Sequence, residues 1–168
     1  MKAKQEKESL LEPSLKDSEL RYRRLFEAAQ DGILLPLGVI MLDVDGLKRC
    51  NDTWGHAAGD AVLRELGSVL LGHFRGEDVS CRYGGDEFVI ILPDASLKVT
   101  YERAQRICEH AIQFQHTFEG KTLDAVTLSI GVAVFPEHGS SNAAILRAAD
   151  NALYHAKHEG RAQVVVAG

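Results

Sequence analysis

The sequence predicts an α/β (α+β) sandwich whose mostly antiparallel central sheet is flanked by helices. Short apolar runs, such as 37–42 and 88–92, have the length and the β-branched content of buried strands. Longer stretches with apolar residues three and four positions apart separate these runs and indicate amphipathic helices. The resulting order, β-α-β-β-α-β-α-β, is close to the ferredoxin-like plan.

Each element is expected from its local pattern. The polar residues from Asn51 to His56 indicate a loop after the first strand. Asn142 is a suitable N-cap for the last helix, and Gly160 marks its end. The other expected elements are helices at 57–74, 93–116 and 142–158 and strands at 79–83, 87–92, 122–135 and 163–166.

Two segments precede the sandwich, which is expected at 36–168. Residues 1–14 are rich in charge and are expected to form a flexible leader. Residues 15–35 are expected to contain a helix, because apolar side chains recur at helical spacing with charges between them. These side chains are Tyr22, Leu25, Phe26, Ala29 and Ile33.

Composition limits the classes of function. The chain of 168 residues suits a single domain, and its net charge of −5 argues against a general nucleic-acid binder, which normally has a basic face. Three widely spaced cysteines suggest neither a disulfide framework nor a zinc site. No apolar run is long enough to cross a bilayer, and the charged start does not resemble a signal peptide. We therefore expect a cytoplasmic protein without a membrane span.

The segment 82–88 carries the strongest chemical signal. Gly84 and Gly85 allow a tight turn and a close approach of the backbone to an anionic ligand. Asp86 and Glu87 follow immediately, at the start of a strand. Carboxylates on a turn that a rigid sheet supports can hold a divalent metal near phosphates. The alternative interpretation is an acidic hairpin without a ligand.

Other acidic residues allow two interpretations each. Asp43 and Asp45 end the first strand, and alternation places them on one face, where they could bind a hard cation or act as turn residues. Asp60, expected in the first turn of its helix, could complement the helix dipole. Alternatively, Asp60 and Asn51 could bind the hydrogen-bonding edge of guanine.

Taken together, the motifs resemble the GGDEF diguanylate cyclase family, whose fold is similar to nucleotidyl cyclase and polymerase palm domains. The resemblance extends over residues 39–166, about three quarters of the chain. It rests on motifs at 42–48, 51–60, 82–88, 129–133 and 148–157, followed by Gly160-Arg161.

The resemblance implies a metal site at the carboxylates. Asp43, Asp86 and the backbone carbonyl of Val44 would ligate Mg²⁺, or Mn²⁺ in its place. Glu87 would be either a further ligand or the base for the attacking 3′-hydroxyl group. The division of roles between Asp86 and Glu87 stays open, because neighbouring strand residues point in opposite directions.

The resemblance also implies how the substrate binds beside the Gly84-Gly85 turn. Asn51 and Asp60 would bind guanine. Lys157 and Arg161, four positions apart at a helix end, would share a face and bind the terminal phosphates. The alternative for this pair is compensation of the helix dipole.

The implied reaction condenses two GTP molecules to cyclic di-GMP and releases two pyrophosphates. Each domain would bind one GTP, so catalysis would need a homodimer. Arg75 and Asp78, with Arg75 nine residues before Gly84, match the family's inhibitory product site. A surface ion pair is the alternative for these two residues.

The chain departs from the family at its start. The usual opening motif and the helix after it are missing, and residues 15–35 instead resemble the start of a PAS sensor domain. We expect the helix at about 15–30 to take the vacant place on the sheet. Two classes of function follow: an active diguanylate cyclase, or an impaired domain that binds cyclic di-GMP or GTP as a regulatory module.

Overall fold

The structure is a computed structural model that describes residues 36–73, 75–113, 117–123 and 125–168. Its elements are β1 (Leu37–Asp45), α2 (Leu47–Trp54), α3 (His56–His73), β2 (Val79–Arg82), β3 (Glu87–Pro93), α4 (Leu97–Gln113), β4 (Thr117–Phe118), β5 (Lys121–Thr122), β6 (Thr127–Phe135), α5 (Asn142–His158) and β7 (Val164–Val166).

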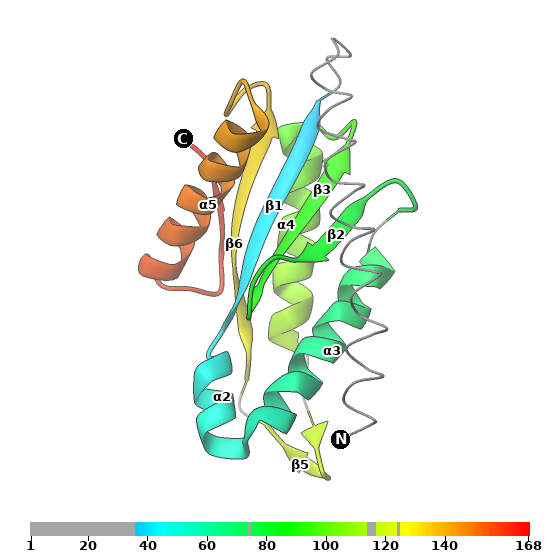
Figure 1. Cartoon of the computed structure of the whole chain (residues 1–168), viewed down its shortest axis with the longest axis vertical. Coiled ribbons are helices and arrows are strands. Elements are labelled where there is room, and N and C mark those ends of the chain that lie inside the picture. The colour runs from blue at the N-terminus through cyan, green and yellow to red at the C-terminus, as the bar shows by residue number, and fades with distance from the viewer. Residues whose placement is uncertain (1–35, 74, 114–116, 124) are drawn as a thin grey trace.

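The main sheet has five strands in the order β2-β3-β1-β6-β7. Only the β6–β7 pair is parallel, and the other neighbours are antiparallel. Helices α3 and α4 cover one face, and α5 covers the other (Figure 1). This confirms the predicted sandwich with a mostly antiparallel sheet.

The central strand β1 is buried along its whole length. It pairs with β3 on one side and with β6 on the other, so that Asp43 lies opposite both Glu87 and Ser129. Since β1 ends in aspartates, this register brings the acidic end of β1 to the start of β3. The sheet therefore joins two motifs that are far apart in the sequence.

Helix α5 packs closely on the sheet at Gly131 of β6. A Cβ atom at this position would lie 2.1 Å from the carbonyl oxygen of Ala149 and 2.3 Å from the backbone nitrogen of Leu153. Only glycine allows this approach without a shift of the helix. The close contact fixes the C-terminal end of α5 relative to the end of β1.

Four predicted details are wrong. The expected loop at 51–56 is mostly helix α2, because Gly46 adopts a left-handed conformation (φ 80°) that turns the chain out of β1, and Leu47 and Cys50 are buried. The packing of these two side chains outweighs the weak helix propensity of the polar residues that follow. Helix α3 begins at His56, so Asp60 lies beyond its first turn.

The remaining two differences concern the second half of the chain. The expected strand at 122–135 is divided into β5 and β6. The expected helix at 93–116 begins only at Leu97, because Pro93 still belongs to β3 and the hydroxyl group of Ser96 accepts a hydrogen bond from the Val99 amide. The other predicted elements agree with the structure within two residues, with Ser141 rather than Asn142 as the N-cap of α5.

The predictions for residues 1–14 and 15–35 lie outside the described residues. Within the part of the chain that is described, no helix is long and apolar enough to cross a membrane. The cysteines in this part form no disulfide bond, and Cys50 and Cys108 are buried.

Candidate active site

The candidate active site lies where β1 ends beside the start of β3. The Lys157 ammonium group on α5 lies 2.8 Å from Oδ2 of Asp43 and 3.9 Å from Oε1 of Glu87. The Val44 amide donates a hydrogen bond to the Asp86 carbonyl oxygen at 3.2 Å. Five of the predicted site residues, from three separate motifs, therefore meet at one place.

The Gly84-Gly85 turn is held by backbone hydrogen bonds. The amides of Tyr83 and Gly84 both donate to the Glu87 carbonyl oxygen, at 2.8 Å and 3.2 Å. Arg82 donates from Nε to the carbonyl oxygens of Gly84 and Gly85, at 3.2 Å and 3.1 Å. A Cβ atom at Gly84 would lie 3.0 Å from Oε2 of Glu87, so glycine leaves room for that carboxylate.

Arg82 is a supporting residue that the sequence analysis did not single out. It also donates from Nη2 to the Gly85 carbonyl oxygen. Its guanidinium group thus stabilises the turn of the motif to which Arg82 itself belongs. The signal that could have identified it is its place two residues before Gly84, from which a long side chain can donate to the carbonyl groups of the turn.

The Asp43 carboxyl group has a raised pKa, mainly because burial disfavours its charged form. The hydrogen bond and the charge of Lys157 oppose this shift, whereas the neighbouring Asp86 and Asp45 add to it. Since the pKa of Asp43 is raised overall, Lys157 does not fully offset the free-energy cost of burying the charged Asp43 carboxylate. A further cation near Asp43 would be favourable.

The donor set fits a hard divalent cation. Asp43, Asp86 and Glu87 offer carboxylate oxygens near the end of β1, and Mg²⁺ commonly takes one or two carboxylates with water and substrate phosphates. Among the described residues, no group of three or more acidic, histidine or cysteine side chains is arranged so that it could hold a metal ion by itself. The site thus fits a metal that is shared with a phosphorylated substrate.

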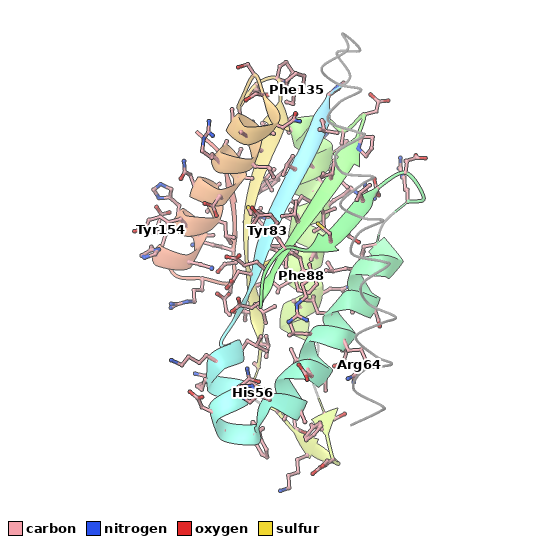
Figure 2. All side chains as sticks on the ribbon, viewed as in Figure 1. His56, Arg64, Tyr83, Phe88, Phe135 and Tyr154 are labelled. Carbon is pink, nitrogen blue, oxygen red and sulfur yellow. The ribbon has the colours of Figure 1, made fainter. Side chains whose placement is uncertain are left out.

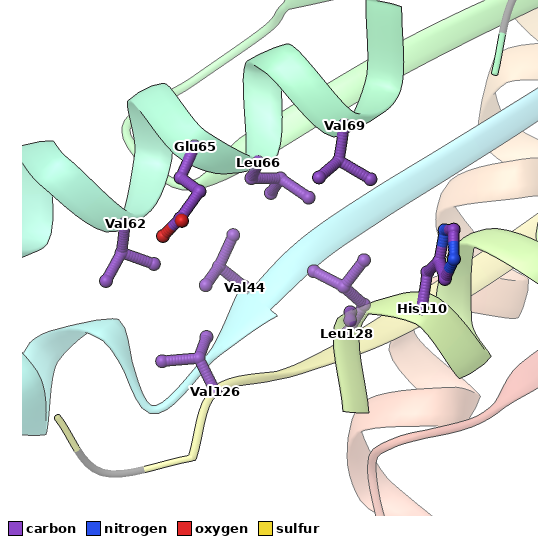
Figure 3. Close-up of a pocket in the computed structure, with 9 residues that line it drawn as sticks. Val44, Val62, Glu65, Leu66, Val69, His110, Val126 and Leu128 are labelled. Atoms are coloured by element: carbon purple, nitrogen blue, oxygen red, sulfur yellow. The ribbon is translucent and has the colours of Figure 1, made fainter. Parts of the chain in front are cut away.

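The side chain of Val44 points away from this site. It lines a cavity of about 20 Å³ beneath α3 and α4, together with apolar side chains that include Val62, Leu66 and Leu128 (Figure 3). Only the backbone of Val44 can therefore contribute to the carboxylate site. This arrangement agrees with the predicted role of its carbonyl group.

A second part of the site is formed by α2 and α3. Oδ1 of Asn51 is buried without a hydrogen-bond partner within the described part of the chain. A Cβ atom at Gly59 would lie 2.0 Å from this oxygen, so glycine allows α3 to approach the Asn51 amide. Asp60 follows on α3 and is exposed. His56 marks the junction of the two helices (Figure 2).

The buried oxygen of Asn51 suggests a ligand. An unpaired buried acceptor costs about 1–3 kcal/mol, a cost that a donor from a bound molecule would remove. A nucleobase edge with N–H groups would supply such a donor to Asn51 and to the exposed carboxylate of Asp60. The pairing of these two residues on guanine stays a prediction.

Arg161 lies near the carboxylates, although not in the predicted way. Helix α5 ends at His158, so Arg161 lies in the following turn (φ 62°) and shares no helix face with Lys157. It reaches the end of β1 from that turn, with Nε 3.7 Å from Oδ1 of Asp45. Arg161 also lines an open polar pocket of about 620 Å³ to which Lys48 and Arg49 contribute.

The three cations around this pocket can attract phosphate groups. Lys48 and Arg49 were not among the predicted site residues. Both lie in the first turn of α2, a helix that the sequence analysis took for the end of a strand followed by a loop. The missed helix explains why these two side chains were overlooked.

The Arg75 and Asp78 pair forms a closed unit away from this pocket. The Asp78 carboxylate accepts hydrogen bonds from the Arg75 amide at 2.6 Å and from Arg103 on α4, at 2.6 Å from Nη2 and 3.2 Å from Nη1. The Asp78 side chain is 2% exposed. Arg103 also donates to the carbonyl oxygen of His73, so it connects the end of α3 with Asp78.

Comparison with known proteins decides the family. The family described as "Diguanylate cyclase, GGDEF domain" matches residues 19–163. The chain belongs to this family. The match begins inside the 15–35 segment, and the resemblance of that segment to a PAS domain stays a prediction.

Curated relatives of this GGDEF domain are longer proteins. The chain is 41% identical over 131 residues to the response regulator PleD of Caulobacter vibrioides, covering 77% of this chain and 29% of PleD. It is 38% identical over 130 residues to diguanylate cyclase A of Treponema denticola, covering 77% of this chain and 35% of that protein. The chain thus spans about a third of the length of these relatives.

Solved GGDEF domains have the same fold. The GGDEF domain of YfiN (TpbB) from Pseudomonas aeruginosa superposes with a TM-score of 0.82 at 35% identity, over 89% of this chain and 87% of that chain. The GGDEF domain of DgcB from Caulobacter crescentus, in complex with c-di-GMP, gives a TM-score of 0.80 at 33% identity, over 90% and 87% of the two chains.

Proposed function

We propose that this GGDEF domain is a diguanylate cyclase that condenses two GTP molecules to cyclic di-GMP and two pyrophosphates. The observation that carries the proposal is the meeting of Asp43, Glu87 and Lys157 at the end of β1. Acidic metal ligands and a phosphate-binding cation are the groups that nucleotidyl transfer needs. Family membership and the names of the relatives support the same reaction.

The metal would be held by Asp43, Asp86, the Val44 carbonyl group and, in one of its two possible roles, Glu87. A bound Mg²⁺ or Mn²⁺ would lower the pKa of the 3′-hydroxyl group and stabilise charge on the phosphates. In its other role, Glu87 would accept the hydroxyl proton directly.

The substrate would be bound from both sides of this centre. Asn51 and Asp60 would accept hydrogen bonds from guanine. Lys157 would exchange its contact with Asp43 for a phosphate oxygen, and Arg161 would bind the terminal phosphates from the open pocket. This exchange would leave the Asp43 carboxylate available to bind the metal when the phosphates of the nucleotide bind to Lys157.

Each domain would bind one GTP, so the reaction needs two copies of the domain facing each other. We expect a homodimer to be active and a monomer to be inactive. The protein would work in the cytoplasm, where GTP and Mg²⁺ are supplied. Activity that rises with the square of the protein concentration at low concentration would support this dependence on a dimer.

The direct test is incubation of the purified chain with GTP and Mg²⁺, with separation of the products by chromatography. Cyclic di-GMP and pyrophosphate are expected, in a ratio of one to two. Product should be absent after chelation of the metal with EDTA and should return with added Mg²⁺. Absence of cyclic di-GMP at every protein concentration would refute the proposal.

A second candidate is a regulatory module that binds cyclic di-GMP or GTP without turnover. Arg75 and Asp78 match the family's inhibitory product site by sequence resemblance, and a structural neighbour was solved in complex with c-di-GMP. In this chain Arg103 already donates a hydrogen bond to the Asp78 carboxylate. Calorimetric titration with cyclic di-GMP would distinguish the candidates, because binding without product formation favours the module.

The placement of segment 15–35 is a separate proposal. We propose that its helix packs on the sheet in place of the family's first helix. Leu25→Ala should then lower the free energy of unfolding by about 2 kcal/mol or more, as for a core leucine. Glu27→Gln on the charged face is the control, and an equal, small effect of both variants in urea denaturation would contradict the packing.

A further inference from the structure

Asp45 is a second aspartate at the end of β1, and its surroundings differ from those of Asp43. Its carboxylate accepts hydrogen bonds from the hydroxyl groups of Thr127, at 2.9 Å, and Ser129, at 2.8 Å to Oδ1 and 3.1 Å to Oδ2. The Ala162 amide donates to Oδ2 at 3.3 Å. The Asp45 side chain is 6% exposed. Protein donors therefore occupy both oxygens of this buried carboxylate.

The Ala162 amide belongs to an unusual turn between α5 and β7. Gly160, Arg161 and Ala162 have φ angles of 129°, 62° and 47°. A left-handed conformation is unfavourable for a residue other than glycine, so two such residues in succession need external support. The support comes from the Arg161 amide, which donates to the Ala156 carbonyl oxygen at 3.0 Å, and from Asp45.

The same turn carries Arg161. Its side chain is 65% exposed, so the guanidinium group can reach a ligand. Nε of this group lies 3.7 Å from Oδ1 of Asp45, and Arg161 is also one of the residues that line the open pocket. Asp45 thus contacts both the backbone of the turn and the side chain that the turn presents.

We propose that Asp45 is a positioning residue, which holds the 160–162 turn and thereby directs Arg161 toward the phosphates of the nucleotide. The inference rests on the proposed binding of phosphate by Arg161. It divides the roles of the two aspartates: Asp43 contributes to metal binding, and Asp45 acts through Arg161. It also gives Ser129 a function, because this hydroxyl group donates to both oxygens of Asp45.

The first test measures the turn without any nucleotide. Amide hydrogen exchange of the full chain, followed by mass spectrometry, is compared for the wild type, Asp45→Asn and the double variant Thr127→Val/Ser129→Ala. Exchange in the 160–163 segment should accelerate about tenfold or more in both, since a charge-assisted hydrogen bond is weakened. The double variant keeps the Asp45 charge, so it separates positioning from charge if Asp45→Asn folds poorly.

The second test is a double-mutant cycle on phosphate binding. Affinity for inorganic triphosphate, without metal, should fall about tenfold in Asp45→Asn, and this loss should vanish when Arg161→Ala is already present. In turnover assays, KM for GTP should rise while the Mg²⁺ concentration at half-maximal activity stays constant. Glu159→Gln, an exposed carboxylate beside the turn whose partner is His155, is the matched control and should change none of these values.

Three results would overturn the inference. These are unchanged exchange at 160–163 in both variants, an equal loss of triphosphate affinity with and without Arg161, or a shifted Mg²⁺ requirement with an unchanged KM for GTP. The last result would make Asp45 a metal ligand. If the wild type forms no cyclic di-GMP, the proposed reaction fails, whereas the exchange and triphosphate measurements still decide the role of Asp45.

Discussion

Asp43 and Asp78 are both acidic residues that face a basic side chain, yet their surroundings differ in one respect. Asp78 receives three hydrogen bonds, two from Arg103 and one from the Arg75 amide, and its side chain is 2% exposed. Among the residues that the structure describes, Asp43 has a single close partner, Lys157, and burial raises its pKa. One carboxylate is satisfied by the protein, and the other is not.

This difference distinguishes carboxylates that stabilise the fold from carboxylates that are available to bind a ligand. A buried carboxylate with all of its acceptor positions filled contributes to the folded state, and removal of a partner leaves a costly unpaired group. A carboxylate that is buried with too few partners makes the folded state less favourable and gains energy from a ligand. Active sites commonly keep such unfavourable groups because the ligand needs them.

The largest expected effect concerns activity. Asp43→Asn should lower cyclic di-GMP formation by about a thousandfold or more, because a metal-binding charge is lost. Asp78→Asn should retain activity within about tenfold of the wild type, since its carboxylate serves the fold. The measurement is the initial rate of cyclic di-GMP formation, followed by chromatography at saturating GTP and Mg²⁺. Equal losses of activity in the two variants would contradict the proposed difference between Asp43 and Asp78.

The reverse order is expected for stability. Asp78→Asn should lower the free energy of unfolding by about 2–4 kcal/mol, because the Arg103 guanidinium group loses its charged partner in a nearly buried place. Urea denaturation followed by circular dichroism measures this effect. Glu102→Gln, an exposed carboxylate on the same helix as Arg103, is the control and should change stability by less than about 0.5 kcal/mol. A loss as small as that of the control would show that the Arg103 contact adds nothing.

Asn51 extends the comparison to an uncharged group. Its buried Oδ1 has no partner among the described residues, so it resembles Asp43 rather than Asp78. Asn51→Ala should raise KM for GTP by about tenfold or more, with a change in unfolding free energy below about 1 kcal/mol. Kinetics with varied GTP and a thermal melt are sufficient, and a large loss of stability with an unchanged KM would assign Asn51 to the fold.

The smallest effect is a pH dependence. Because the folded-state pKa of Asp43 is raised above its ordinary value of 3.8, the stability associated with this group is fully present below that pH and is lost as the pH rises through the raised value. Asp43→Asn should therefore be slightly more stable than the wild type at neutral pH. This advantage should disappear as the pH falls below 3.8. A variant less stable than the wild type at pH 7 would mean that Lys157 stabilises Asp43 more than burial disfavours it.

Much of the site could be predicted because each motif contains its own chemistry. The Gly84-Gly85 turn, the carboxylates after it and the aspartates at the end of β1 are readable from residue type and strand periodicity alone. Asn51 could be singled out by residue type, although the helix that carries it was taken for a loop, and its pairing with Asp60 stays a prediction. Short polar helices that depend on packing, such as α2, give no periodic signal.

From the sequence alone we could predict the order of most elements, the mostly antiparallel sheet and the residue types of the candidate site, but not helix α2 or the short strands β4 and β5. Local propensity and apolar periodicity act over a few residues, so they are legible in the chain. Tertiary contacts determine which carboxylates find hydrogen-bond partners within the protein. Arg103 lies 25 positions from Asp78, and Ser129 lies 84 positions from Asp45, and these pairs form only when α4 and β6 pack beside their partners. The sheet register and the helix packing therefore separate the carboxylates that hold the fold from those left for a ligand.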